Sequence, residues 1–253
     1  LYWTVTLLMC AVSLIPGAFH QFTFSLTSLL KSLFFVPYSD QSGNIWPLVV
    51  PGWTLNYEMF FYIVFAACLA AGRTGIALPL LLIFVGIGAA FSPADPILQT
   101  YTNPILLEFA AGVALARMSE GFRSYSLGMA LLAAGVVGMA LAAFVGVDQD
   151  PSRWIRILCL GLPAIALVAG ALSVEQSGEW TDLPALQRLG DASYSLYLLH
   201  GLVIAFTHKF LRIPLLESSL AIGLSILVSL LSYRYFERSA TKWLKERLMV
   251  NRS

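Results

Sequence analysis

The chain has 253 residues, of which 58% are hydrophobic and only 11% are charged, and its formal net charge is +1. Soluble domains carry about 25% charged residues, so this composition indicates an integral membrane protein and excludes an ordinary soluble domain. The near-neutral charge argues against a nucleic-acid partner, because domains that bind nucleic acids present a basic face. The three cysteines lie in apolar runs without metal-ligand spacing, so we expect buried thiols and no metal site.

Apolar segments of roughly 20 residues, the length that crosses the hydrocarbon core, recur along the chain. We therefore predict an all-α fold, a polytopic transmembrane helix bundle of about eight spans that forms one membrane domain over residues 1–253. In chain order the predicted spans are 1–19, 51–72, 75–91, 104–118, 127–146, 155–173, 192–206 and 219–235.

Lys and Arg set the predicted orientation, because they collect on cytoplasmic loops. Residues 234–253 form a basic tail, which places the C-terminus in the cytoplasm. The predicted crossings then put ten of the basic residues on the inner side and five on the outer side. Arg234, Arg238 and Lys242 follow one another at i+4 steps in the tail. We interpret this stripe as a membrane anchor, with contact to an anionic cofactor as the alternative.

Residues 20–50 form the longest predicted connection and lie on the outer side. Leu26–Val36 has an apolar face with one lysine, which predicts a helix along the membrane interface. Residues 39–47, Ser-Asp-Gln-Ser-Gly-Asn-Ile-Trp-Pro, are rich in turn formers and are expected to border an outer cavity.

Glu58 is the most unusual residue, because it lies within a predicted span. A carboxylate in a span costs roughly 2.5–3.5 kcal/mol on insertion scales and is normally kept for a function. Thr54, Glu58 and Tyr62 are spaced i, i+4 and i+8, so they share one helix face. We interpret this stripe as the wall of a polar cavity, with Glu58 roughly 10 Å below the outer end. A purely structural Glu58, protonated or bonded to another helix, is the alternative. Glu108 is a weaker candidate, because it lies close to the outer interface.

A second polar stripe ends at His200. Ser193, Tyr197 and His200 fall at i, i+4 and i+7 on one helix face, and His200 lies roughly 10 Å from the cytoplasmic end. Histidine is the side chain best suited to proton transfer near neutral pH. A packed, hydrogen-bonded structural histidine is the alternative.

The depths of Glu58 and His200 differ by about 10 Å in a core of roughly 30 Å, so we expect no contact between them. We expect them to line opposite ends of one passage, with Glu58 toward the outer side and His200 toward the inner side. Such a protein either transports a molecule or joins a donor and an acceptor that arrive from opposite sides.

The transport alternative is a proton-coupled secondary transporter, which predicts an internal repeat that the sequence does not show. A structural membrane protein, tolerant of replacement at Glu58, is a third interpretation.

Three stretches carry a combined pattern: WTLNYEMFFY at 53–62, LGDASYSLYLLH at 189–200 and YFER at 235–238. Together they resemble the acyltransferase-3 family of multi-pass membrane O-acyltransferases. The first is similar to the family signature W-[ST]-L-x-x-E-x-x-F-Y, the second to its late element G-x-x-S-Y-x-x-Y-L-x-H, and the third to its closing segment. Their order and spacing also fit, so the resemblance spans most of the chain.

The resemblance implies about ten spans in the full protein, with this chain holding the last eight and lacking the first two. Leu1-Tyr2-Trp3 is similar to the end of the Arg-rich segment that precedes the third span of the family. The family's catalytic histidine belongs to its first span, so its role is not transferred to His200. As a fragment, the chain is expected to be inactive.

The resemblance further implies the reaction and its setting. An acyl group, usually acetyl, passes from a cytosolic acyl-CoA to a hydroxyl of a surface carbohydrate, a lipid-linked glycan or a similar acceptor. The acyl-CoA is a co-substrate and not a tightly bound cofactor, and the enzyme lies in a bacterial inner membrane. Glu58 and His200 are the catalytic candidates. The acceptor-side candidates are Trp53, Thr54 and Tyr62, and the donor-side candidates are Ser193, Tyr194 and Tyr197.

Overall fold

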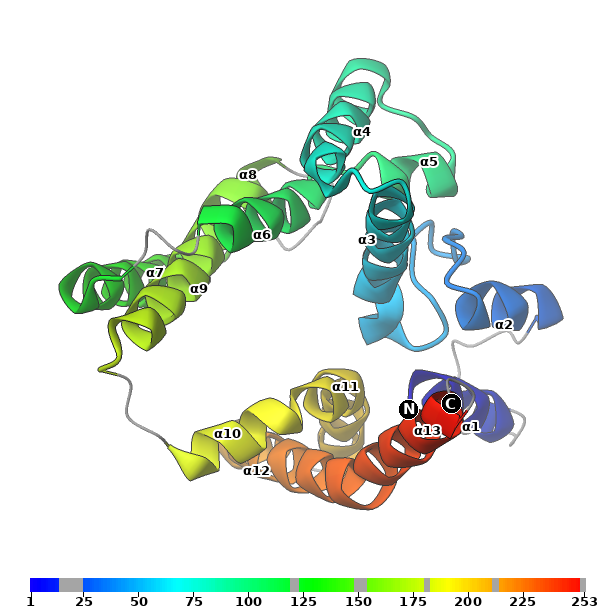
Figure 1. The fold of residues 1–253 in the computed structure, drawn as a ribbon. Coiled ribbons are helices and arrows are strands. Elements are labelled where there is room, and N and C mark those ends of the chain that lie inside the picture. The colour runs from blue at the N-terminus through cyan, green and yellow to red at the C-terminus, as the bar shows by residue number, and fades with distance from the viewer. Residues whose placement is uncertain (14–24, 119–122, 148–153, 180–182, 211–213, 251–253) are drawn as a thin grey trace. The chain divides into compact units, whose positions relative to one another are not determined.

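The structure is a computed structural model that describes residues 1–13, 25–118, 123–147, 154–179, 183–210 and 214–250. Regular structure in this part of the chain is helical throughout, which confirms the predicted all-α class (Figure 1). The chain divides into two compact units, of which the first contains Leu1–Thr54 and Leu183–Ser253 and the second contains Leu55–Asp182. The first unit is thus built from both ends of the sequence. That residues 1–253 form a single domain stays a prediction.

The first unit contains an amphipathic helix, a bent helix pair and a long C-terminal helix. Its α10 and α11 are bent by 69° where they meet, between Asp191 and Ser193. The helix predicted within Leu26–Val36 is present as α2, which ends at Leu33, and its position along the membrane interface stays a prediction. In chain order its elements are α1 (Tyr2–Ser13), α2 (Leu26–Leu33), η1 (Val50–Gly52), α10 (Pro184–Asp191), α11 (Ser193–Phe210), α12 (Pro214–Ser232), the π-helical turn η5 (Tyr233–Glu237) and α13 (Arg238–Val250).

The second unit begins inside α3, whose first two residues belong to the first unit. In chain order its elements are α3 (Trp53–Ala70), η2 (Thr74–Ile76), α4 (Ala77–Phe91), α5 (Pro96–Tyr101), α6 (Leu106–Met118), α7 (Tyr125–Val145), α8 (Trp154–Arg156), the π-helical turn η4 (Ile157–Gly161) and α9 (Leu162–Ser177). Local chemistry sets several of these ends. The Asp95 carboxylate accepts from the backbone N–H groups of Ile97 and Leu98 and so caps α5. Gly146, with φ of 69°, ends α7 in the left-handed conformation.

Each predicted span falls on a helix of the structure. Among the described residues, five helices are long and apolar enough to cross a membrane, or six if the bent α10–α11 pair is one span. The helices α1 and α6, with 12 and 13 residues, are shorter than the roughly 20 that a span requires. Residues 14–19 of the first predicted span lie outside the described residues. The arrangement is typical of a multi-pass membrane protein, and the count of eight spans stays a prediction.

Helices α7 and α9 of the second unit pack closely through small residues. A Cβ atom added to Gly128 would lie 2.6 Å from Cγ2 of Val174, and one added to Gly170 would lie 2.8 Å from the carbonyl oxygen of Gly128. A Cβ atom at Gly135 would lie 2.6 Å from Cγ of Leu167. Lipid supplies no hydrophobic force between helices, so close contact of this kind is what holds membrane helices together.

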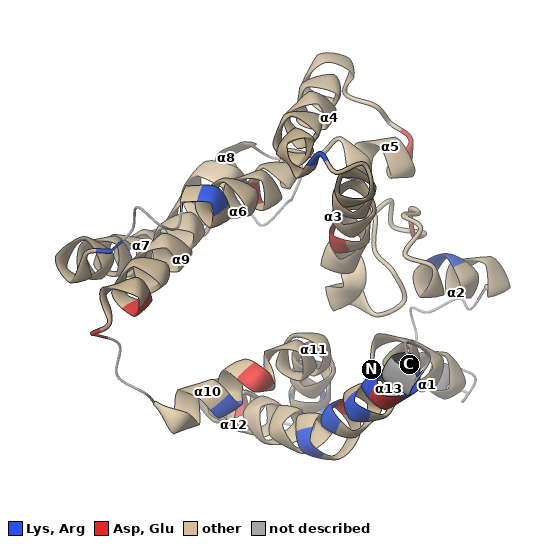
Figure 2. Ribbon diagram, viewed as in Figure 1, with Lys and Arg blue, Asp and Glu red and all other residues tan. Residues whose placement is uncertain are grey.

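The basic residues of the predicted tail lie on a helix that continues α12 through η5. Figure 2 shows Lys and Arg along α13, where they alternate with only a few acidic side chains. The described members of this series are Arg234, Arg238, Lys242, Lys245 and Arg247. Residues 251–253, the end of the predicted tail, lie outside the described residues. The cytoplasmic position of the C-terminus stays a prediction.

Candidate functional site

The Tyr197 hydroxyl joins α11 to the beginning of α3 within the first unit. It donates to the carbonyl oxygen of Pro51 at 2.5 Å and lies 2.7 Å from Oγ1 of Thr54. A carbonyl oxygen only accepts and a phenol has one proton, so the Thr54 hydroxyl donates to the Tyr197 oxygen. The two elements are in contact here, because a Cβ atom added to Gly201 would lie at van der Waals distance, 3.4 Å, from Cγ of Pro51.

His200 lies one helical turn beyond Tyr197 and is oriented by it. Its Nδ1 lies 2.6 Å from the Tyr197 carbonyl oxygen, and the two ring centroids are 6.0 Å apart. Because that oxygen only accepts, Nδ1 carries a hydrogen, and Nε2 of the neutral ring carries a lone pair. This hydrogen bond orients the imidazole ring within α11.

The contact between Thr54 and Tyr197 differs from the sequence-based expectation. The sequence predicts Thr54 on the outer side and Tyr197 on the inner side, because each residue is placed relative to its own predicted membrane surface. In the structure, Tyr197 in the second turn of α11 instead contacts Thr54 in the first turn of α3 and the preceding Pro51. The expected separation of these two residues is not found.

Glu58 follows Thr54 by one turn on the same face of α3, and it is half-buried. In the described part of the chain its carboxylate makes no hydrogen bond or ion pair. Tyr62, a further turn along, is 53% exposed and lines a cavity of about 830 Å³ between α3 and α6. The lining of that cavity is largely aromatic and aliphatic, and it includes Phe61, Phe65 and Phe109.

The remaining candidates lie where α3 and α11 begin. Trp53 starts α3 and is half-buried. Ser193 starts α11 and is exposed, and its neighbour Tyr194 is 37% exposed. All three lie in the first unit, as do Thr54, Tyr197 and His200. Their binding roles stay predictions.

A part-buried polar cluster around Ser195 was not predicted. Ser195 is fully buried, donates to Oε2 of Glu237 at 2.7 Å, and lies 3.3 Å from Oγ of Ser232. Ser232 and Glu237 are five residues apart, a spacing that an α-helix would place on different sides. The π-helical turn η5 between them closes i to i+5, so both side chains reach the same serine. The visible signal is the acidic residue in the closing YFER stretch, just after the last apolar run.

Glu108, the weaker acidic candidate, is paired within the second unit. Its Oε1 accepts from Nη1 of Arg156 at 2.8 Å, and the two side chains are 33% and 14% exposed, respectively. This partly buried ion pair joins α6 to α8 and gives Glu108 a structural role.

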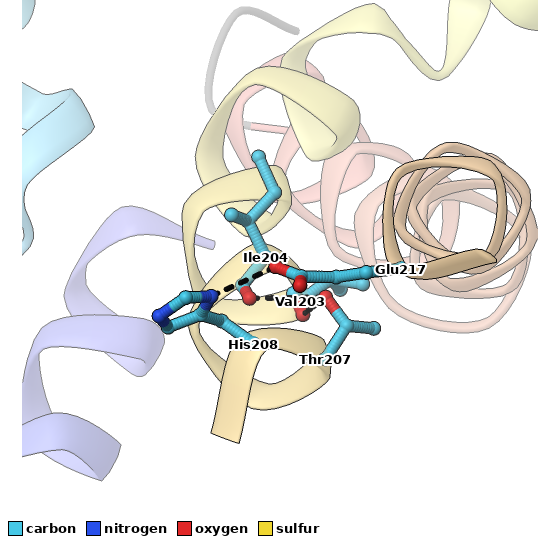
Figure 3. A network of polar contacts seen from close by, with 5 residues as sticks. All are labelled: Val203, Ile204, Thr207, His208 and Glu217. Atoms are coloured by element: carbon cyan, nitrogen blue, oxygen red, sulfur yellow. Dashed lines mark hydrogen bonds and ion pairs between the residues drawn. The ribbon is translucent and has the colours of Figure 1, made fainter. Parts of the chain in front are cut away.

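His208 belongs to a separate network near the other end of α11 (Figure 3). Its Nδ1 lies 2.9 Å from Oε1 of Glu217, and its side chain is 79% exposed. Thr207 is satisfied locally, because its hydroxyl lies 3.0 Å from the carbonyl oxygens of both Val203 and Ile204. The two described histidines of α11 thus have different surroundings: His200 is held by its own helix, and His208 pairs with α12.

Comparisons with known proteins match most of the chain. A family model described as an acyltransferase domain matches residues 1–234, a range that includes the stretches at 53–62 and 189–200 and ends just before 235–238. The chain is similar to the exopolysaccharide production protein ExoZ of Rhizobium meliloti (strain 1021). The two are 39% identical over 231 residues, which cover 88% of this chain and 68% of that protein. No solved structure matches the chain.

Proposed function

The chain belongs to the acyltransferase-3 family, and on that premise we propose that it O-acylates a surface polysaccharide from within the membrane. Members of such a family transfer acyl groups other than aminoacyl groups. The observation that carries the choice of acceptor is the relative named for exopolysaccharide production, which is 39% identical over most of both chains. We further propose a bacterial inner-membrane location, about eight spans with a cytoplasmic C-terminus, and a cytosolic acyl-CoA, usually acetyl-CoA, as donor.

The proposed reaction moves one proton and one acyl group. The acceptor hydroxyl oxygen bonds to the acyl carbon, the carbon–sulfur bond of the thioester breaks, and the hydroxyl proton ends on the coenzyme A thiol. Glu58 would accept a hydrogen bond from the acceptor hydroxyl or orient the base that deprotonates it, with Trp53, Thr54 and Tyr62 beside the acceptor. His200 would exchange a proton through Nε2 at the donor thioester.

The network around Tyr197 supports the part assigned to His200. It holds the imidazole through Nδ1 and leaves the lone pair of Nε2 to do chemistry. Ser193 and Tyr194, on the preceding turn of α11, would complete the donor side. Family membership favours this enzyme over the proton-coupled transporter, which needs no acyl donor.

The experiment is a gene deletion followed by complementation in the native host. The exopolysaccharide is purified, and its O-acyl content is measured by NMR and mass spectrometry. Wild-type full-length protein should restore O-acylation, and Glu58→Gln should lower it by about 100-fold, the lower range for loss of a general acid or base. Glu246→Gln is the matched control, because Glu246 is 65% exposed on α13.

Two outcomes would contradict the proposal, at different levels. An exopolysaccharide with the same acyl content in the deletion strain would remove the proposed function. Full O-acylation by the Glu58→Gln protein, at membrane levels equal to wild type, would remove the role of Glu58 and leave the function standing. In detergent-purified protein, acetyl-CoA should be consumed only when the deacylated polysaccharide is added, and no consumption would remove acetyl-CoA as donor.

A further inference from the structure

A second cavity lies in the first unit, along the connection between α2 and η1. Its volume is about 610 Å³, and its lining combines hydroxyl groups, a carboxylate and an exposed indole. Residues from both α2 and the turn-rich segment contribute: Ser25, Ser28, Tyr38, Asp40, Gln41 and Trp46. This polar lining differs from the largely apolar cavity between α3 and α6.

The wall of this cavity is fixed to α2 through one buried serine. Ser32 is 1% exposed, its Oγ lies 3.1 Å from the Tyr38 hydroxyl, and the same Oγ accepts from the backbone N–H of Leu48 at 3.1 Å. The Tyr2 hydroxyl of α1 donates to the Ser32 carbonyl oxygen at 3.2 Å. Both ends of the connection are thus attached to one point on α2.

The tip of the connection is organised by Asp40. Its Oδ1 accepts from the backbone N–H groups of Ser42 and Asn44, both at 2.8 Å, and its own N–H donates to the Asn44 carbonyl oxygen at 2.8 Å. Gly43 adopts a φ of 82°, which the tight turn requires. A wall fixed before binding loses less conformational entropy when a ligand arrives.

Trp46 presents an apolar ring beside these polar groups. It is 43% exposed, whereas Leu48 and Val49, which follow it closely, are 7% and 2% exposed. A tryptophan at the membrane interface is ordinary in itself. Here the ring borders a cavity of hydroxyl and carboxylate oxygens, so an apolar surface and hydrogen-bonding groups face one space.

A sugar ring has matching chemistry, because it carries C–H groups on its faces and hydroxyls around its rim. An aromatic ring covers such a face, and serine, tyrosine and aspartate oxygens bond such hydroxyls. Burial, with the Asp40 carboxylate nearby, raises the pKa of Tyr38, so its hydroxyl stays a neutral hydrogen-bonding group. The described lining residues include one carboxylate, and Lys31 of α2 lies over the Tyr38 ring, with Nζ 5.9 Å from its centroid.

We propose that the cavity bordered by Tyr38, Asp40 and Trp46 is a subsite that binds a saccharide unit of the polymeric acceptor. The inference rests on the proposed function and adds the segment that recognises the polymer. The subsite sets affinity for the polysaccharide, and the acyl-transfer residues lie on other elements.

The first test measures binding without catalysis. Full-length protein in nanodiscs is titrated with oligosaccharides cut from the host's exopolysaccharide and chemically deacylated, and binding is followed by calorimetry. Trp46→Ala should weaken binding by about tenfold, as expected for loss of one stacking aromatic anchor. Trp154→Ala is the matched control, because Trp154 starts α8 and is 49% exposed, close to the 43% of Trp46. Trp46→Phe keeps an aromatic ring and should retain most of the affinity, which guards against a folding defect in the alanine variant.

The second test separates this inference from the proposed function. In O-acylation assays, Trp46→Ala should raise KM for the oligosaccharide about tenfold and leave kcat and the KM of the acyl donor unchanged. Wild-type KM in this variant would overturn the subsite while the proposed function stands. An equal rise in Trp154→Ala would show that loss of another exposed tryptophan has the same effect, and it would also overturn the subsite. If the wild type acylates no saccharide at all, the proposed function fails and the inference fails with it.

Discussion

The side-chain oxygens of Thr54 and Tyr197 lie 2.7 Å apart, although 143 residues separate the two in the sequence. Thr54 belongs to the WTLNYEMFFY stretch and Tyr197 to the LGDASYSLYLLH stretch. The bond therefore joins two signature stretches of the family, and the Pro51 carbonyl oxygen shares the same tyrosine. His200 is held by the main-chain carbonyl of that tyrosine, a contact within α11.

Tyr197→Phe should destabilise the protein, because it removes the hydroxyl that bonds both Pro51 and Thr54. We expect a loss of about 1–2 kcal/mol in the free energy of unfolding, the range for removing a partner from part-buried hydrogen bonds. Thermal unfolding of the purified protein in detergent measures it. Tyr125→Phe, at a 42% exposed position of α7, is the control and should leave Tm unchanged. Equal Tm values for both variants would contradict the structural role of this hydroxyl.

His200→Ala should abolish most O-acylation, and added imidazole should restore part of it, because the missing group is a proton acceptor at Nε2. His208→Ala should keep wild-type activity, because His208 is 79% exposed and pairs with Glu217. The measurement is the initial rate with full-length enzyme, with and without imidazole. Absence of rescue, with normal folding, would indicate that His200 acts in structure and not in proton transfer.

Ser195 and Glu237 should be energetically coupled. Ser195→Ala removes a donor that lies 2.7 Å from a carboxylate oxygen and is fully buried, so a loss of about 1–2 kcal/mol is expected. A double-mutant cycle with Glu237→Ala should give an interaction free energy of about 1 kcal/mol, because neighbouring partners are not additive. Additive effects of the two substitutions on unfolding would show that the contact contributes nothing.

Glu108→Ala should cost more stability than its partly exposed position suggests. It leaves Arg156, which is 14% exposed, without the carboxylate 2.8 Å away. We expect about 1–2 kcal/mol, between the values for exposed and for buried pairs. Replacing both Glu108 and Arg156 by Gln should cost less free energy of unfolding than the sum of Glu108→Gln and Arg156→Gln. Thermal unfolding of these two single variants and the double variant checks this. A double variant that loses the full sum would argue against the pair.

Gly135→Leu should disrupt the α7–α9 contact, because even a Cβ atom there would lie 2.6 Å from Leu167 and 2.9 Å from the Pro163 carbonyl oxygen. The expected result is little folded protein in the membrane, measured as the monodisperse fraction after detergent extraction. Gly86→Ala in α4 is the control, because a Cβ atom there meets nothing within 4 Å. Normal yield of the leucine variant would show that the helices do not pack this closely.

The sequence predicted the positions of the helices well, because an apolar run of membrane length is a local property of the chain. It also singled out Glu58 and His200, since a charged or titratable residue in such a run is visible without knowing its neighbours. The sequence did not show which side chains these residues contact in the folded protein. The contact of Thr54 with Tyr197 depends on how α11 approaches η1, which no local pattern of the sequence shows.

Ser195 shows the same limit at another position. The helical period that groups Ser193, Tyr197 and His200 puts Ser195 on a different face. Nothing in the local sequence marks a serine there as part of a hydrogen-bonded cluster. Its importance comes from Glu237, which an α-helical period carries away from Ser232. Only the widened turn at the end of α12 brings the three oxygens together.

That widened turn sets the rotational phase between α12 and α13. A π-helical turn is equivalent to one residue inserted into an α-helix, and one residue corresponds to about 100° of rotation. Deleting a single residue from Tyr233–Glu237 would keep the helix continuous, yet it would turn every following side chain by that angle. The basic side chains of α13 would then face a different direction around the helix axis. The length of this short segment therefore determines which face of the helix carries the C-terminal positive charges.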